Sequence, residues 1–141
     1  MSNQEAVNIT KEQLNAFMDK DWEKWSSVCA EDCVYDEIPT HSRIEGRQNV
    51  LAAMKGWTTA FPDVKGSYDN VTIDGNKATF QITWRGKHTG PLQTPEGDIP
   101  ATGKNIEIRA CIISEVENGK VKTFQNYFDM MTMMTQLGIN N

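Results

Sequence analysis

The sequence predicts one α+β domain in which helices cover the concave face of a curved antiparallel sheet. Apolar residues recur at helical spacing in the first part of the chain, up to Pro62, whereas strand-like segments dominate from residue 64 onward. Tight-turn signals join these strands in succession, which is typical of a hairpin meander. Helices and strands that are segregated along the chain define the α+β class. Such a sheet leaves a conical interior, and small-molecule sites usually occupy enclosed, mostly apolar spaces of this kind.

Composition limits the possible functions. The 141 residues are expected to form a single domain, residues 1–141, that is large enough for a hydrophobic core. The net charge of −5 and the lack of a basic run argue against nucleic acid or an anionic membrane surface as partner. No apolar stretch is long enough to span a bilayer, and the first residues carry no secretory signal. Cys29, Cys33 and Cys111 form no CxxC motif and are expected to be reduced thiols, which favours a cytoplasmic location.

Three helices are expected before residue 64. Apolar residues at helical spacing predict the first over about residues 5–19. Asp21 is the expected cap of a second, short helix that carries an apolar stripe and ends near Ala30. A third amphipathic helix lies between Gly46 and Pro62, because a helix usually ends before a proline.

Strands are expected at residues 33–35, 67–73, 77–85 and 106–116 and, last, from Lys120 onward. The final two are joined through an Asn-Gly pair, which is a strong hairpin signal because both central residues of a type I′ turn have positive φ. A short helix is expected to follow the last strand and to end the chain.

Residues 86–103 interrupt the strand pattern and hold three of the five prolines and four of the ten glycines. Long ordered loops in compact domains are often functional. Because prolines limit the freedom of the chain, we expect this segment to form an ordered lid or the rim of a pocket rather than a free linker.

Asp129 follows the last strand and is surrounded in sequence by aromatic and methionine residues, from Tyr127 to Met134. A carboxyl group buried among such neighbours would hold its proton more tightly than a solvated one. In a pocket, Asp129 would be a candidate general acid or base. The alternative is that it only caps the short helix that follows, which aspartate does well. The two interpretations are compatible, and the sequence leaves both open.

A proton-transfer site also needs a second polar group to stabilise developing charge, and apolar walls to exclude water. The candidates for the second group are Tyr35, His88, Gln125 and Asn126. Gln125 is preferred to Asn126 because it shares strand parity with Asp129. The candidate walls are Trp25, Trp57, Phe61, Trp84 and Met130, each of which could equally be plain core. These walls, with Tyr35 and Gln125, are the expected substrate contacts. With two histidines and no ligand spacing, no metal site is expected.

The strands carry many large apolar residues, among them Ile106, Ile108, Ile112 and Phe124. These strands carry more apolar surface than a sheet with one face in water can hold. We therefore expect a second copy to cover the outer face, which would give a symmetric homodimer packed through the sheets.

Several short motifs, taken in order, resemble one known family. They are Phe61-Pro62-Asp63, Trp84, Gly86-Lys87-His88-Thr89-Gly90, the Pro-x-x-Gly-Lys of Pro100 to Lys104, Gly119-Lys120-Val121, Tyr127-Phe128-Asp129 and Gln136-Leu137-Gly138. Over about residues 5–138 the chain resembles the SnoaL-like polyketide cyclase family of the nuclear-transport-factor-2-like superfamily. The resemblance implies a cone-shaped fold, a homodimer and a pocket for a hydrophobic small molecule. It also implies acid–base chemistry that uses no metal and no organic cofactor.

The resemblance also assigns catalytic roles. In the cyclases an aspartate at a strand end moves protons during an intramolecular aldol closure, and Asp129 matches that position. A histidine on a pocket strand assists in those enzymes, but Glu115 lies near the corresponding position here. His88 belongs to a motif of the family. Asp129 and His88 are therefore the expected catalytic residues.

Two sister families offer alternatives. Epoxide hydrolases of the limonene type use an Asp-Arg-Asp set, and Arg85 and Asp129 could fill two of those places, while Lys87 stands where the second Asp is expected. Ketosteroid isomerases place a base after the first strand, where Asp36 or Glu37 is similar in location. The expected function is binding of a hydrophobic small molecule in the cone, with aldol closure as in polyketide or ester cyclases. The alternatives are an epoxide hydrolase- or ketosteroid isomerase-like enzyme, or a non-catalytic ligand-binding or interaction module.

Overall fold

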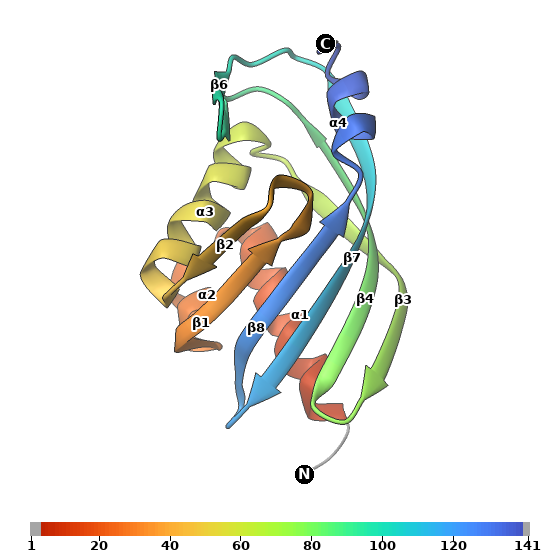
Figure 1. Cartoon of the computed structure of the whole chain (residues 1–141). Coiled ribbons are helices and arrows are strands. Elements are labelled where there is room, and N and C mark those ends of the chain that lie inside the picture. Colours follow the sequence, from red (N-terminus) through yellow and green to blue (C-terminus); the bar gives the residue numbers. More distant parts are fainter. Residues whose placement is uncertain (1–3, 140–141) are drawn as a thin grey trace.

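The domain is a curved sheet with helices packed on one side of it (Figure 1). The computed structural model describes residues 4–139. Its main sheet has six strands in the order β2-β1-β8-β7-β4-β3. The elements in chain order are α1 (Gln4–Asp19), α2 (Trp22–Ser27), β1 (Cys29–Glu37), the short 3-10 helix η1 (Ile38–Thr40), β2 (Ser42–Glu45), α3 (Arg47–Ala60), β3 (Lys65–Asp74), β4 (Lys77–Lys87), β5 (Leu92–Thr94), β6 (Gly97–Ile99), β7 (Asn105–Glu117), β8 (Lys120–Phe128) and α4 (Met130–Gln136). The α+β cone predicted from the sequence is confirmed.

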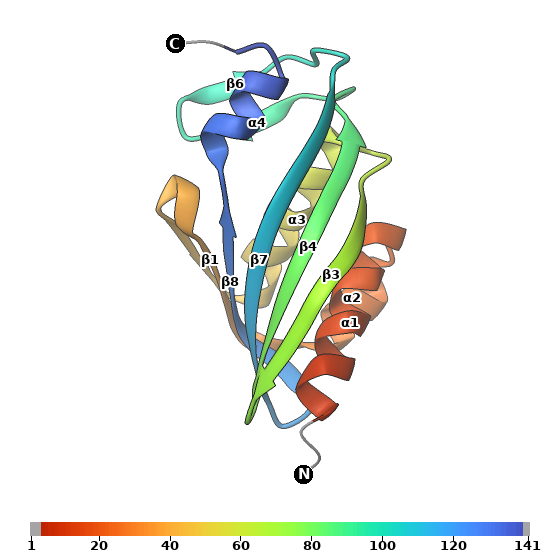
Figure 2. The ribbon, with the colours of Figure 1, turned by 90° about the vertical axis from the view of Figure 1, so that its right-hand side faces the viewer.

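The helices lie where the apolar spacing predicts them, except that α2 is shorter. Its N-terminus is capped as expected, because the side chain of Asp21 accepts a hydrogen bond from the backbone N–H of Lys24 at 3.2 Å. The helix ends at Ser27 instead of near Ala30, since β1 already begins at Cys29. Figure 2 shows α1 and α2 together on one side of the sheet, where α1 contacts β3, β4, β7 and β8.

The first strand differs most from expectation. Instead of residues 33–35 it covers Cys29–Glu37, and it forms a hairpin with β2 that the sequence did not reveal. It also pairs with β8 in parallel, with Cys29 beside Val121. The sheet is thus mostly antiparallel, with one parallel pair that the sequence did not predict. The physical reason is that α2 returns the chain to the sheet end at which β8 starts, so both strands run the same way.

Strand β7 shows that the apolar residues behind the dimer argument point inward. Its burial alternates, and Ile106, Ile108 and Ile112 are buried in the core together with Phe124 of β8. The period of two places these side chains on the face that α1 covers. The predicted excess of apolar surface on the outer face is thus wrong, and the argument for a dimer from these residues fails.

The segment of residues 86–103 does not line the interior cavity. It contains the small hairpin of β5 and β6, which packs against α3 through the buried Leu92. Gly90 is required there, because a Cβ atom at this position would lie 2.0 Å from the carbonyl oxygen of Thr59. The segment therefore behaves as a structural clamp on α3, and its predicted role as the rim of the cavity is not seen.

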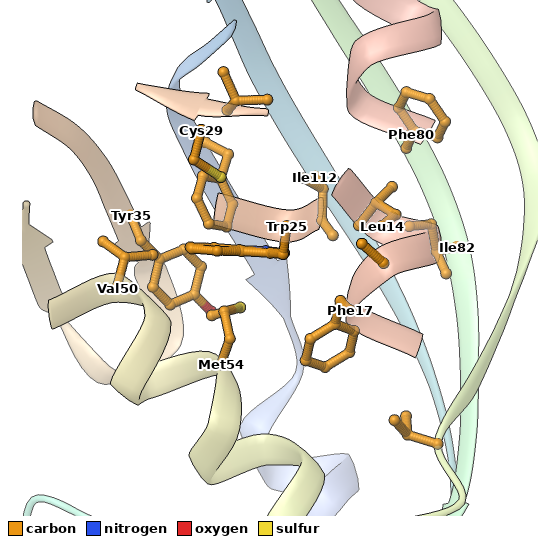
Figure 3. Close-up of a cluster of buried hydrophobic side chains, with 14 of the residues drawn as sticks. Leu14, Phe17, Trp25, Cys29, Tyr35, Val50, Met54, Phe80, Ile82 and Ile112 are labelled. Carbon is orange, nitrogen blue, oxygen red and sulfur yellow. The ribbon is translucent and has the colours of Figure 1, made fainter. Parts of the chain in front are cut away.

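The core lies between the helices and the sheet (Figure 3). Trp25 of α2, Met54 of α3 and Tyr35 of β1 point into this space, and Leu14 and Phe17 of α1 enter it from the side of β4 and β7. No helix within residues 4–139 is long and apolar enough to cross a membrane.

Candidate functional site

A cavity of about 90 Å³ lies inside the cone, between the helices and the inner face of the sheet. Its walls are almost entirely apolar, and aromatic rings form much of them. Five of the predicted substrate contacts line it: Trp25, Tyr35, Trp57, Phe61 and Trp84. The structure therefore brings these side chains together around one space, although they come from four separate elements and the turn after α3.

Two of the predicted contacts do not line the cavity, Gln125 and Met130. The inward-facing residues of β8 are Phe124, Asn126 and Phe128, so the strand has the opposite parity from that assumed for Gln125. The preference for Gln125 over Asn126 as the inward amide is wrong for this reason. Met130 begins α4 and packs at the edge of the core.

A connected group of polar side chains lies at the cavity wall where β1 ends. The hydroxyl of Tyr35 donates a hydrogen bond to Oε2 of Glu37 at 2.6 Å, and the indole N–H of Trp57 donates to the same oxygen at 3.3 Å. The other carboxylate oxygen accepts a hydrogen bond from the hydroxyl of Thr40 at 2.8 Å. The amide of Asn126 donates to the Tyr35 oxygen at 3.0 Å. Tyr35 is thus held from both sides, with Glu37 behind it.

Local structure explains why these groups meet. Tyr35 and Glu37 are two residues apart on one strand, so both face inward. The parallel pairing with β8 places Glu37 beside Asn126. The 3-10 turn that follows β1, with Pro39 near its start, folds Thr40 back onto the carboxylate.

Burial and charge determine the protonation of Tyr35. Burial, followed by the negative charge of Glu37, raises the pKa of the Tyr35 hydroxyl well above its usual value. The hydroxyl therefore keeps its proton at neutral pH and shares it with Glu37. A protonated hydroxyl next to a carboxylate in an apolar cavity is an arrangement that can take up and release protons.

Asp129 occupies the strand end predicted for it but does not face the cone. Its side chain is exposed and accepts hydrogen bonds from the backbone N–H of Met131 at 3.0 Å and from the hydroxyl of Thr132 at 2.8 Å. The bonds from Thr132 and Met131 lower the pKa of Asp129, so it is ionised at neutral pH. The structure confirms the helix-capping interpretation. The catalytic assignment of Asp129 stays a prediction.

His88 is fully buried but is not one of the cavity-lining residues. Its Nδ1 accepts a hydrogen bond from the backbone N–H of Thr102 at 3.2 Å, and its ring packs against Phe61 with centroids 5.3 Å apart. Burial lowers the pKa of His88, so the ring is neutral at neutral pH. These contacts tie the segment of residues 88–104 to the domain. A structural role accounts for them, and the catalytic role of His88 stays a prediction.

The residues compared with the Asp-Arg-Asp set of the epoxide hydrolases, Arg85, Lys87 and Asp129, do not meet at the cavity. Arg85 and Lys87 are exposed, and the guanidinium of Arg85 forms an ion pair with Glu107 at 2.9 Å. None of these residues, nor Asp129, lines the cavity. Glu37, in contrast, has the location noted for the base of the ketosteroid isomerases.

Sequence reasoning undervalued Glu37 and Asn126. The signal for Glu37 was present, because the alternation Tyr35-x-Glu37 puts a carboxylate on the same strand face as a tyrosine. The signal for Asn126 depended on knowing which face of β8 is inward. Only the positions of Phe124 and Phe128, which line the cavity on either side of it, reveal that face.

The fold and its interior cavity define an α+β cone of the nuclear-transport-factor-2-like class. A protein from Jannaschia Sp. CCS1 that carries the name SnoaL-like polyketide cyclase superposes with a TM-score of 0.87 at 16% identity, covering 98% of this chain and 94% of that one. TsrD from Streptomyces laurentii superposes with a TM-score of 0.83 at 19% identity, covering 99% of both chains. An LEH-like epoxide hydrolase from M. tuberculosis gives a TM-score of 0.74 at 19% identity, covering 95% of this chain and 90% of that one. At these identities the likeness concerns the fold alone.

The family of this protein follows from its amino-acid sequence. The family model described as SnoaL-like polyketide cyclase matches residues 8–137, nearly the whole chain, and the protein belongs to this family. No curated protein matches the chain. The resemblance seen in the short motifs is thereby confirmed.

Proposed function

We propose that this protein performs cofactor-free proton-transfer chemistry on a hydrophobic small molecule held in the cavity, as in cyclase-type carbon–carbon bond closure. The observation that carries the proposal is the hydrogen bond of 2.6 Å between the Tyr35 hydroxyl and Glu37 at the wall of an otherwise apolar cavity. Membership of the SnoaL-like polyketide cyclase family supports it. So does the apolar wall, which excludes water and strengthens polar interactions inside.

The pair can move a proton in two coupled steps. A ligand C–H bond next to a carbonyl breaks and its proton passes to the Tyr35 oxygen, while the Tyr35 proton passes to the carboxylate of Glu37. The resulting carbanion attacks a second carbonyl of the same ligand, and the new alkoxide regains the proton by the reverse path. The amide of Asn126, which donates to the Tyr35 oxygen at 3.0 Å, stabilises negative charge that develops there.

Isotope exchange tests this step without knowledge of the natural substrate. The wild-type protein, in deuterated water with a panel of cyclic hydroxyketones and β-keto esters, should catalyse exchange of the acidic C–H for deuterium. Glu37→Gln and Tyr35→Phe should slow that exchange by about two to four orders of magnitude, the usual contribution of a positioned acid or base. The matched control is Glu45→Gln, because Glu45 is exposed and, within residues 4–139, forms an ion pair with Arg43 alone. A Glu37→Gln variant that exchanges at the wild-type rate would rule out the pair.

The second candidate function is ligand binding without chemistry. It is favoured by the three hydrogen bonds that Glu37 accepts, because they already engage both of its carboxylate oxygens within the protein. Under this alternative the panel compounds should bind to the wild-type protein with no exchange above the rate in buffer.

A further inference from the structure

The volume of the cavity limits the size of the ligand that it can hold. An apolar protein cavity of about 150 Å³ accommodates benzene, and pockets for drug-sized ligands measure about 300–1,000 Å³. The cavity here measures about 90 Å³. It is smaller than the cavity that accommodates benzene, so one ring is the upper limit for a ligand, and a molecule with several fused rings is too large.

The walls that set this size support one another. The indole of Trp57 is held by its hydrogen bond to Glu37 and contacts the rings of Phe61 and Phe128 at centroid distances of 6.4 and 5.8 Å. The ring of Tyr35, whose hydroxyl donates to the same carboxylate oxygen, packs on Phe124 with ring centroids 4.8 Å apart. Interlocked aromatic rings cannot move aside singly, so the cavity resists expansion.

Two side chains that line the cavity carry buried oxygen atoms that accept no hydrogen bond within residues 4–139. Oδ1 of Asn126 is buried and has no hydrogen-bond partner within the described part of the chain. Its amide orientation follows from the network, because the Tyr35 proton is given to Glu37 and the Tyr35 oxygen must then accept from Nδ2 of Asn126. Oε1 of Gln13, on a side chain that also lines the cavity, is likewise buried without a partner among residues 4–139. A buried acceptor left unpaired is costly, so each requires a donor from a ligand or water.

We propose that the natural ligand is an uncharged molecule of about one ring that carries a hydroxyl or N–H group, and that this group donates to Asn126. A phenol or a cyclic hydroxyketone fits this description, whereas a polycyclic polyketide does not. The nearby carboxylate of Glu37 disfavours anionic ligands. This inference rests on the proposed function only in using the same cavity, since it concerns binding and not the proton transfer.

Binding of simple probes tests the ligand class. Titration calorimetry would compare phenol with toluene, which has the same size but no donor, and with 1-anthrol, which has the donor but three fused rings. Tryptophan emission provides a second readout, because Trp25, Trp57 and Trp84 line the cavity. Phenol should bind more tightly than toluene by about two- to tenfold, the usual value of one neutral hydrogen bond. Binding of 1-anthrol should be undetectable under the same conditions.

Three variants test which residues recognise the ligand. Asn126→Leu should remove the preference for phenol over toluene, while Gln125→Leu, one residue away on the outer face of β8, should keep it. Phe128→Ala, which enlarges the cavity, should admit 1-naphthol. Tighter binding of 1-anthrol than of phenol to the wild-type protein would overturn the inference, and this comparison needs no variant to fold. An unchanged preference in a folded Asn126→Leu variant would overturn it as well.

The two proposals fail separately. Selective phenol binding without any isotope exchange would support the ligand class and contradict the proton transfer. Exchange on multi-ring ketones together with absent phenol binding would contradict the ligand class and support the proton transfer.

Discussion

At the scale of single residues, Tyr35 links the cavity to the carboxylate behind it. It accepts from Asn126 and donates to Glu37, and both bonds lie in a region that burial removes from water. Removing the hydroxyl would leave an amide donor and a carboxylate each short of one partner. The residue therefore contributes to stability as well as to the proposed chemistry.

Replacing Tyr35 by phenylalanine should lower the free energy of unfolding by about 1–3 kcal/mol at pH 8, the usual cost of unpaired buried polar groups. The difference should shrink above about pH 10. Because the pKa of Tyr35 is raised in the folded state, tyrosine in the unfolded chain ionises first, and the wild-type protein loses stability as pH rises through that range. Urea unfolding of both proteins at pH 8 and at pH 10.5 checks this. A difference that stays constant at both values would contradict it.

The environment of Asp129 differs from the one that its neighbours in sequence suggested. Its aromatic and methionine neighbours in sequence suggested burial, but a residue at the end of a strand can leave the core even when its neighbours do not. Phe128 lines the cavity, whereas Asp129 is exposed one position later. Sequence neighbours therefore did not predict the environment of this carboxylate.

At the scale of elements, Asp129 is the cap of α4. Asp129→Asn should keep most of the stability, since asparagine also accepts from the first backbone N–H groups, while Asp129→Ala should lower the melting temperature. The lowered pKa of Asp129 means that its charge-dependent contribution is present above about pH 4 and is lost as pH falls further. Thermal unfolding at pH 7 and pH 3 compares the three proteins. An alanine variant as stable as the wild type at pH 7 would contradict the cap.

The clamp on α3 depends on Gly90. A Cβ atom there would lie 2.0 Å from the Thr59 carbonyl oxygen, so Gly90→Ala must push backbone apart and should cost about 2 kcal/mol or more. The matched control is Gly56→Ala within α3, where the added Cβ meets only the flexible side chain of Gln93 at 3.3 Å. That control should be neutral or stabilise by about 0.5–1 kcal/mol. Urea unfolding of both variants decides, and a Gly90→Ala variant as stable as Gly56→Ala would refute the clamp.

Elements with local signals were predictable, and elements defined by distant partners were not. Helical spacing, caps and Asn-Gly turns lie within a few residues, so α1, α3 and the hairpin of β7 and β8 follow from the sequence. The parallel pairing of β1 with β8 joins Cys29 to Val121 and has no local signature. The same pairing assembles Glu37 with Asn126, which is why the candidate site could not be derived in full.

At the scale of the whole molecule, the structure places the apolar surface inside. The outer face of the sheet carries Cys111, Ile113 and Tyr127 among polar side chains, and Tyr127 is 39% exposed. A symmetric homodimer and a cytoplasmic location, implied by the family resemblance and by composition respectively, remain our proposals.

If the dimer forms through this face, light scattering at micromolar concentration should give twice the mass of the chain, about 16 kDa per copy. Tyr127→Glu should reduce the mass to that of one copy, because it places a charge on the face that would be buried. The matched control is Ile73→Glu at the end of β3, which is equally exposed at 38%. A wild-type protein that is monodisperse as a monomer would contradict the dimer.

The central claim is that the chemistry of this cone resides at Glu37 and Tyr35 rather than at the strand-end Asp129. The most direct test is the deuterium-exchange rate of one cyclic hydroxyketone with Glu37→Gln and Asp129→Asn side by side, each checked for a wild-type melting profile. The account predicts a loss of about two to four orders of magnitude for Glu37→Gln and a near wild-type rate for Asp129→Asn. The reverse order, with exchange abolished by Asp129→Asn and retained by Glu37→Gln, would contradict it.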